Sequence, residues 1–246
     1  MIKLKTWQLA IVGVAVIGGL MYFSDRPVTV EGGEALIRNR TEYEKVSQDA
    51  TTMVLSIFAK VDQGQEATPE ELETVKRALS KFRALQTYEP RQVMSFYGGA
   101  RCYQILGEKQ RASEQYEQAV LNLSTDAARD NQGVRLTAYE AMAQLASICL
   151  ELGAEKLADA NSLGQAGDKA GSEESTRVAN LIYNKALRHS QSAVEAVPQA
   201  YKYWLIHGNV LLAVGKKAEA RAAIIQAKKI APDDAEVKVM AKMVGA

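Results

Sequence analysis

The chain has 246 residues, of which 47% are apolar, 24% charged and 7% aromatic. Such a composition supports a packed core, and the small number of aromatic residues and prolines favours helices over a sandwich of many short strands. The net charge of +1 provides no electrostatic reason to bind nucleic acid, so we expect no nucleic-acid partner. Two cysteines, Cys102 and Cys149, are too few for a disulfide-stapled scaffold or a four-ligand zinc site.

The first predicted element is a membrane anchor. Residues 6–24 carry no charge, and as a helix they would span about 28 Å, close to the thickness of a bilayer's hydrocarbon core. Lys3 and Lys5 precede this segment, whereas Asp25 and Arg26 cancel after it. The positive-inside rule then places the N-terminus in the cytoplasm and the body outside it. The alternative is a cleaved signal peptide, but no A-x-A-like site precedes Asp25.

These observations predict a single-pass protein of the plasma (inner) membrane with a periplasmic or otherwise extracytoplasmic body. Residues 1–24 would form the cytoplasmic tip and the anchor, and residues 25–34 a linker. Contact with the lipid bilayer would be made through residues 6–24.

Helical periodicity dominates the body. Residues 35–63 are predicted as one helix from their spaced apolar side chains. A second helix is predicted to begin at Thr68, where a capping hydroxyl is followed by Pro69 and, three residues on, by the Glu71 carboxylate. Pro90 would end it. Residues 233–246 are predicted to form an amphipathic helix that caps the body, with dimerisation through the same face as the alternative.

A pattern of small and large residues recurs within this helical region. From Tyr201 onward it consists of Trp204, Gly208, Leu211, Gly215, Ala220, Ile224, Ala227 and Pro232. It recurs at Phe96, Gly99, Ala100, Tyr103, Gly107, Ala112, Tyr116 and Ala119. A partial copy contains Met142, Leu145, Ala146, Cys149 and Gly153, followed at a distance by Ala186, Ala193 and Pro198. Gly107, Gly153 and Gly215 are predicted to close the first helix of each pair.

This pattern resembles the tetratricopeptide (TPR) repeat family, whose period of 34 residues separates Pro198 from Pro232. His207, Leu211 and Ile224 depart from the family signature. The resemblance implies a TPR-like α-solenoid of about four helical hairpins over residues 35–232. Together with the predicted anchor, the expected fold is all-α, with an N-terminal transmembrane helix followed by this solenoid. A glycine- and serine-rich insertion at about 154–176 is predicted to be flexible, and a role in binding is the alternative.

The resemblance also implies a concave groove, lined by the first helix of each repeat, that binds proteins. Family groove positions correspond to Met94, Tyr97, Arg101 and Gln104, then Ala143, Ser147 and Glu151, then Lys202, Leu205, Asn209 and Leu212. The concentrated basic set of the carboxylate-clamp subfamily is missing. The expected partners are therefore proteins, membrane-associated ones in particular, but not acidic chaperone tails.

No catalytic motif is found, and His189 and His207 lack neighbours patterned as a ligand set or a triad. We therefore expect no enzymatic activity, no cofactor and no metal site. The favoured function is a membrane-anchored scaffold or assembly factor. The alternative is an accessory subunit embedded in a larger membrane complex. Pairing of Cys102 with Cys149 and homo-oligomerisation are left open by the sequence.

Overall fold

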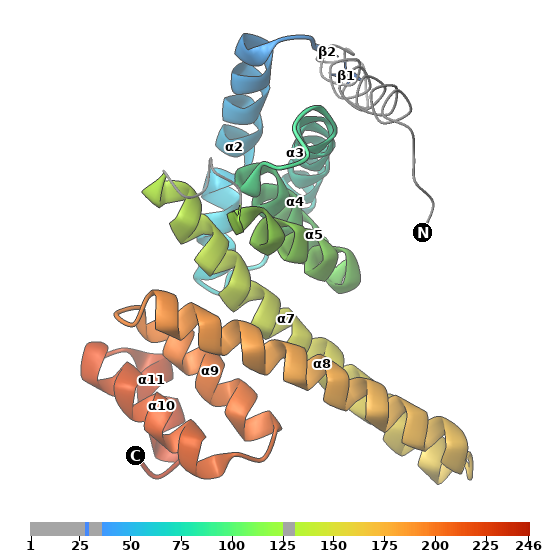
Figure 1. The fold of residues 1–246 in the computed structure, drawn as a ribbon, viewed down its shortest axis with the longest axis vertical. Helices are drawn as coiled ribbons and strands as arrows, with labels where there is room; N and C mark the ends of the chain where they lie inside the picture. Colours follow the sequence, from blue (N-terminus) through green and yellow to red (C-terminus); the bar gives the residue numbers. More distant parts are fainter. Residues whose placement is uncertain (1–27, 30–35, 125–130) are drawn as a thin grey trace, which may run out of the picture. The chain divides into compact units, whose positions relative to one another are not determined.

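The computed structural model describes residues 28–29, 36–124 and 131–246 (Figure 1). By internal contacts the chain divides into two compact units, Met1–Arg91 and Gln92–Ala246, and each is described by itself. The all-α prediction holds for the described residues, apart from two strands of two residues each. No helix in this part of the chain is both long and apolar enough to cross a membrane. The predicted anchor at residues 6–24 lies outside the described residues.

The first unit begins with a short antiparallel ladder. Strand β1 (Val28–Thr29) pairs with β2 (Leu36–Ile37) in the register Val28 to Ile37. Helix α2 (Arg40–Asp62) follows, and the side chain of its N-cap residue Asn39 accepts a hydrogen bond from the Glu42 amide at 3.0 Å. The prediction of a helix from residue 35 was therefore wrong at its start. Apolar spacing identified the buried face of α2, but its beginning is set by the cap at Asn39.

Helix α3 (Pro69–Tyr88) begins where the sequence predicted. The Thr68 hydroxyl accepts a hydrogen bond from the Glu71 amide at 3.3 Å, and the Glu71 carboxylate accepts one from the Thr68 amide at 2.7 Å. The same carboxylate lies 2.7 Å from Lys60 Nζ at the end of α2 and so joins the two helices. Their core consists of Val46, Ala50, Val54 and Ile57 from α2 and Val75, Ala78, Phe82 and Leu85 from α3.

The second unit is a succession of helices in which each packs on the next (Figure 1). The first members of successive pairs, α4, α7 and α9, also contact one another, as in a stack of hairpins. The elements are α4 (Val93–Ile105), α5 (Lys109–Leu121), the 3₁₀ turn η1 (Asn122–Ser124), α7 (Gln132–Gln165), α8 (Lys169–Ala196), α9 (Tyr201–Ala213), α10 (Lys217–Ile230) and α11 (Ala235–Met243).

Small residues of the repeated pattern allow the paired helices to approach closely. Ala220 and Ala227 on α10 are fully buried, as is Ile224 between them. A Cβ atom added at Gly208 on α9 would lie only 2.5 Å from Cδ1 of Ile224. Gly208 is thus required by the distance between α9 and α10 rather than by its backbone conformation.

The glycines predicted to close the first helices behave differently from one another. Gly107 and Gly215 follow α4 and α9 with φ angles of 77° and 79°, the left-handed conformation typical of a helix end. Gly153 was predicted to do the same, but it is a helical residue in the middle of α7. A Cβ atom at Gly153 would lie 2.5 Å from the Tyr183 ring of α8, so this glycine serves close packing instead.

The segment predicted as a flexible insertion is the far end of a long helical hairpin. Helix α7 continues to Gln165 and α8 begins at Lys169, so that only three residues connect them. Figure 1 shows the two helices side by side along the part of the hairpin that leads to this turn. The prediction of a loop at 154–176 was therefore wrong. Only one of the three clustered glycines, Gly167, adopts a turn conformation, with a φ of 85°, whereas Gly164 and Gly171 are helical.

Helix α11 covers the end of the stack. Its N-cap residue Asp234 accepts hydrogen bonds from the amides of the first turn. Val237 is fully buried and Met240 is 7% exposed, and both belong to one apolar cluster with Leu205 of α9 and Ile224 of α10. The side of α11 that carries Val237 and Met240 is therefore packed on the last repeat.

Candidate functional site

The groove residues predicted on α4 lie in different environments. Met94 is exposed, and Tyr97 is half-buried with its ring centroid 5.9 Å from that of Tyr116. Gln104 is half-buried and accepts a hydrogen bond from the Tyr116 hydroxyl at 2.8 Å. Arg101 is only 4% exposed, so its predicted place on the binding surface is corrected. Because most of α4 is buried, the family spacing does not bring this position to solvent.

On α7 the predicted positions are also divided. Ala143 is fully buried in a cluster with Val194 of α8, whereas Ser147 is half-buried. Glu151 is exposed, and its carboxylate lies 2.9 Å from Lys109 Nζ at the start of α5. The same ammonium lies 2.7 Å from Glu155, and hydrogen bonds to the two carboxylates raise the pKa of Lys109 to about 12. Glu151 therefore joins α7 to α5 in this structure.

On α9, Lys202 is exposed, while Asn209 and Leu212 are half-buried. Leu205 is 2% exposed, and its predicted place on the binding surface is corrected. The reason is α11, whose residues Val237 and Met240 pack on Leu205. In the last repeat, Leu205 therefore packs against the terminal helix α11 instead of facing solvent.

A chain of hydrogen-bonded side chains connects the first helices of the stack, and the sequence did not predict it. Gln104 Nε2 donates to Gln144 Oε1 at 3.5 Å, and Gln144 Nε2 donates to Glu140 Oε1 at 2.9 Å. The Tyr203 hydroxyl of α9 donates to Glu140 Oε2 at 2.8 Å. Burial and this carboxylate together raise the pKa of Tyr203, which stays protonated. Glu140 and Gln144 lie beside the family groove positions on α7, so family spacing alone passed over them.

The two thiols are free and buried. Burial raises the pKa of Cys102 to about 12 and also raises that of Cys149, so both are neutral thiols at pH 7. A buried neutral thiol is a poor nucleophile and packs as a small apolar residue. Among the described residues, no group of three or more His, Cys, Asp or Glu side chains is placed to hold a metal ion.

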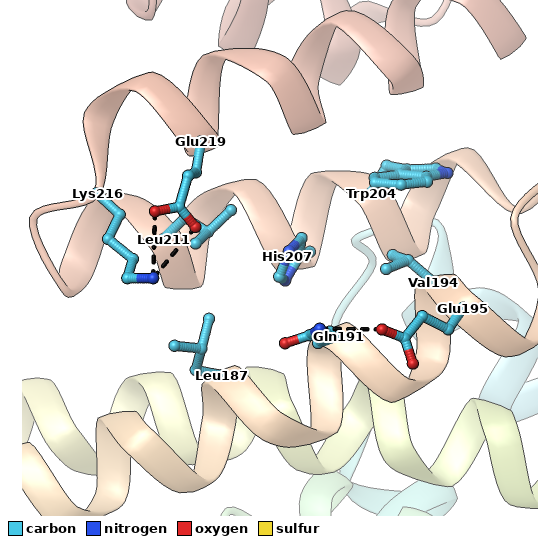
Figure 2. A pocket seen from close by; sticks show the side chains of 9 residues that line it. All are labelled: Leu187, Gln191, Val194, Glu195, Trp204, His207, Leu211, Lys216 and Glu219. Atoms are coloured by element: carbon cyan, nitrogen blue, oxygen red, sulfur yellow. Dashed lines mark hydrogen bonds and ion pairs between the residues drawn. The ribbon is translucent and has the colours of Figure 1, made fainter.

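A pocket of about 270 Å³ opens between α8, α9 and the start of α10 (Figure 2). Apolar and aromatic side chains make up much of its wall, and polar side chains are set around them. The lining residues are Leu187, Gln191, Val194 and Glu195 from α8, Trp204, His207 and Leu211 from α9, and Lys216 and Glu219 from the α9–α10 connection and α10.

The aromatic side chains of the pocket are held in place by hydrogen bonds. Trp204 Nε1 donates to the carbonyl oxygen of Pro198 at 2.8 Å, and the indole lies edge to face with the His207 ring at a centroid distance of 6.4 Å. His207 Nδ1 lies 2.9 Å from the Ser190 hydroxyl of α8. Burial lowers the pKa of His207, so the imidazole is neutral at pH 7. The Trp204 indole and the neutral His207 imidazole, each with a hydrogen-bond partner, therefore line the pocket.

Acidic side chains stand at two places around the pocket (Figure 2). Glu195 Oε1 accepts a hydrogen bond from the neutral Gln191 amide at 2.9 Å. Glu219 is instead paired with Lys216, whose Nζ lies 3.1 and 3.2 Å from the two carboxylate oxygens. With His207 neutral, two carboxylates and one ammonium give the lining residues a net charge of −1.

No protein-family model matches the chain, and no curated protein matches it in sequence. Among solved structures it is similar to YrrB, described as a TPR protein with an unusual peptide-binding site, at 13% identity and a TM-score of 0.29. That alignment covers 81% of this chain and 97% of YrrB. The chain is also similar to a chain of the APC/C hetero-tetramer Cut9–Hcn1, at 15% identity and a TM-score of 0.25, over 82% of this chain and 46% of that one. Both structural similarities are weak. The description of helical repeats in this chain therefore rests on the paired packing of its own helices.

Proposed function

We propose that this chain is a membrane-anchored scaffold or assembly factor that binds other proteins through its helical repeats on the extracytoplasmic side. The observation that supports this most is the stack of helical pairs in residues 92–246, which holds the pocket between α8, α9 and α10 on three packed helices. Binding residues held on packed helices are positioned better than residues on loops. A protein partner would bind without paying for reorganisation of this surface.

The anchor is the second part of the proposal. Its support is in the sequence alone: an uncharged stretch at residues 6–24 with Lys3 and Lys5 before it. Confining the protein and a membrane-associated partner to one membrane raises their effective concentration for each other. A modest affinity at the pocket and the neighbouring helices is then sufficient for function.

Affinity purification of the full-length protein from membranes solubilised in a mild detergent tests the binding function. We expect the same protein partners in independent preparations, and fewer of them when Glu195→Gln and Trp204→Ala are combined. A Glu173→Gln variant, at an exposed position near the start of α8, is the matched control. Recovery of no reproducible partner with folded protein would contradict the proposal.

A separate experiment tests the membrane topology. Protease added to spheroplasts should degrade the body of the protein, whereas a tag placed before Met1 should survive until the membrane is opened. Release of the intact protein from membranes by high salt or carbonate would contradict the predicted anchor. The binding function would then still be tested by the affinity purification described above.

An accessory subunit embedded permanently in a larger complex is the second candidate. It is favoured by exposed apolar side chains at the end of the stack, with Val239 62% and Met243 65% exposed on one side of α11. Side chains four residues apart share a helix face, and a permanent interface would bury this pair. Co-migration with a fixed set of proteins on native gels, at constant stoichiometry, would distinguish this role from transient scaffolding.

A further inference from the structure

The pocket between α8, α9 and α10 has an acidic end at Glu195, whose carboxylate charge is not neutralised by a cation among the lining residues. Gln191, which donates to Glu195, is neutral, and an amide hydrogen bond does not cancel a carboxylate charge. At the other end Lys216 neutralises Glu219. An incoming side chain thus meets a net negative charge near Glu195 and an internal ion pair near Glu219.

The wall beside Glu195 is aromatic. Figure 2 shows the Trp204 indole nearly edge-on, with one face turned toward Val194 of α8 and with Glu195 beyond Val194 in this view. The hydrogen bond from Trp204 to the Pro198 carbonyl fixes that orientation. An indole face attracts a cation within about 6 Å of its centroid, and tryptophan is the strongest aromatic partner for this contact.

Aliphatic side chains also line the pocket. Val194 lies near Glu195 and Trp204, whereas Leu187 and Leu211 lie nearer to the Lys216–Glu219 pair. The cavity of about 270 Å³ is too small for most drug-sized ligands but large enough for a long side chain. Its chemistry therefore suits an aliphatic stem that ends in a cation.

We propose that this pocket binds an arginine side chain presented by the protein partner. The guanidinium stacks on the Trp204 face and pairs with the Glu195 carboxylate, while the aliphatic stem lies against Leu187 and Leu211. This inference rests on the proposed function, because it names the chemistry of the partner that the scaffold recognises.

Arginine fits this arrangement better than other side chains. Its planar cation can stack on an indole and donate two hydrogen bonds to one carboxylate, whereas the compact, strongly hydrated ammonium of lysine cannot do both. An acidic side chain would be repelled by the net charge of the lining. A purely apolar side chain would desolvate Glu195 without offering it a partner.

The experiment uses the full-length protein and N-acetyl-arginine amide as the probe. A Trp7→Phe background leaves Trp204 as the single tryptophan, so its indole N–H resonance can be followed by NMR during titration. We expect a saturable shift of this resonance with the arginine probe. N-acetyl-citrulline amide, a neutral analogue of nearly the same shape, should cause little shift, and N-acetyl-lysine amide should bind more weakly than the arginine probe.

One pocket variant and one control variant make the test quantitative. Glu195→Gln should weaken binding of the arginine probe about three- to tenfold, the usual range for losing one exposed charge pair and its hydrogen bonds. Glu173→Gln, on the same helix but outside the pocket, should leave binding unchanged. Equal shifts with arginine and citrulline, an unaltered affinity of the Glu195→Gln variant, or no shift with arginine would overturn the proposal.

The outcomes separate this inference from the proposed function. If partners are captured from membranes as strongly by the Glu195→Gln variant as by the parent, and the arginine probe does not bind, the scaffold stands and the arginine pocket fails. If the probe binds but no partner is recovered, the pocket stands as an arginine site and the scaffold fails.

Discussion

At the scale of single residues, one of the closest approaches in the repeats occurs where α9 packs on α10. Gly208 has no side chain, and Ile224 fills the space that one would occupy. Ile224 is fully buried and belongs to the cluster that also contains the α11 residues Val237 and Met240, so its close-packed neighbours oppose a shift of its side chain. One methyl group at residue 208 therefore affects the contact between two helices.

Gly208→Ala should destabilise the protein by about 1–3 kcal/mol, the usual cost of overpacking a core. In an exposed helix the same change would be favourable by up to about 1 kcal/mol, because alanine is the better helix former. Gly164→Ala, at an exposed helical position of α7, is the matched control and should be close to neutral, because its new Cβ would lie 3.3 Å from the Ser172 hydroxyl oxygen, which can rotate away. Urea unfolding measures both. A stable Gly208→Ala variant would show that α9 and α10 are not in such close contact.

The two histidines make stability dependent on pH. Burial lowers the pKa of both His189 and His207 in the folded protein, so the unfolded chain takes up a proton first as the pH falls through about 6.5. Stability should thus be lost as the pH falls from 7 to 5. Around His207 the facing charges are Glu195 of α8, Glu219 of α10 and Lys216 before it, with burial the largest influence.

His207→Asn keeps a polar atom near Ser190 but cannot be protonated. In this variant the free energy of unfolding should fall less between pH 7 and pH 5 than in the parent. Adding His189→Asn should reduce this pH-dependent fall further. Thermal denaturation at a series of pH values measures the difference. An identical pH dependence in parent and variants would contradict the burial of these imidazoles.

At the scale of helices, the long α7–α8 hairpin shows what the sequence could and could not predict. Three glycines and two serines near residue 167 predicted a loop, yet Ala160 is 2% exposed and Ala179 is fully buried. Pairing of the two helices along their length overrides the weak local preference of such residues. Composition predicted a break within residues 154–176, and the structure limits that break to the short turn at Gly167.

Asn161→Pro tests this helix directly. A proline at this exposed position in the interior of α7 would remove a backbone hydrogen bond and cost about 3 kcal/mol or more if the segment is helical. In a flexible loop it would have almost no effect. The matched control is Asn161→Ala at the same exposed position, which keeps the backbone hydrogen bond and suits a helix. Circular dichroism and urea unfolding should show a loss for the first variant only.

The capping box of α3 is the opposite case, since the sequence signature at Thr68 predicted it correctly. Thr68→Ala removes the acceptor of the Glu71 amide and should cost about 1 kcal/mol of stability. Thr68→Ser should restore most of the loss, because its hydroxyl can accept the same hydrogen bond. Equal stability of the alanine and serine variants in urea unfolding would show that the cap contributes nothing.

At the scale of the whole molecule, the repeated intervals predicted which residues are buried much better than which are exposed for binding. Small repeat residues such as Ala112, Ala119, Ala186 and Ala220 are fully buried as expected, because close packing constrains their size. Exposure of a groove position depends instead on which other elements cover it. Leu205 is covered by α11, and no spacing within α9 could have indicated that.

The pocket could not be predicted for a related reason. Its residues come from α8, α9 and α10 and are up to 32 positions apart in the sequence, from Leu187 to Glu219. They converge only when the helical pairs stack. His207 departs from the repeat signature, and its contact with Ser190 explains how a polar ring is accommodated there.

The most direct test of the account is photo-crosslinking in living cells. A photoreactive amino acid is placed at Gln191, on the wall of the pocket, and at Glu173 on the same helix as the control. The account predicts a reproducible adduct with a partner protein from position 191 that Glu195→Gln diminishes, and none from position 173. Adducts formed equally from both positions, or from neither in a folded and membrane-located protein, would contradict it.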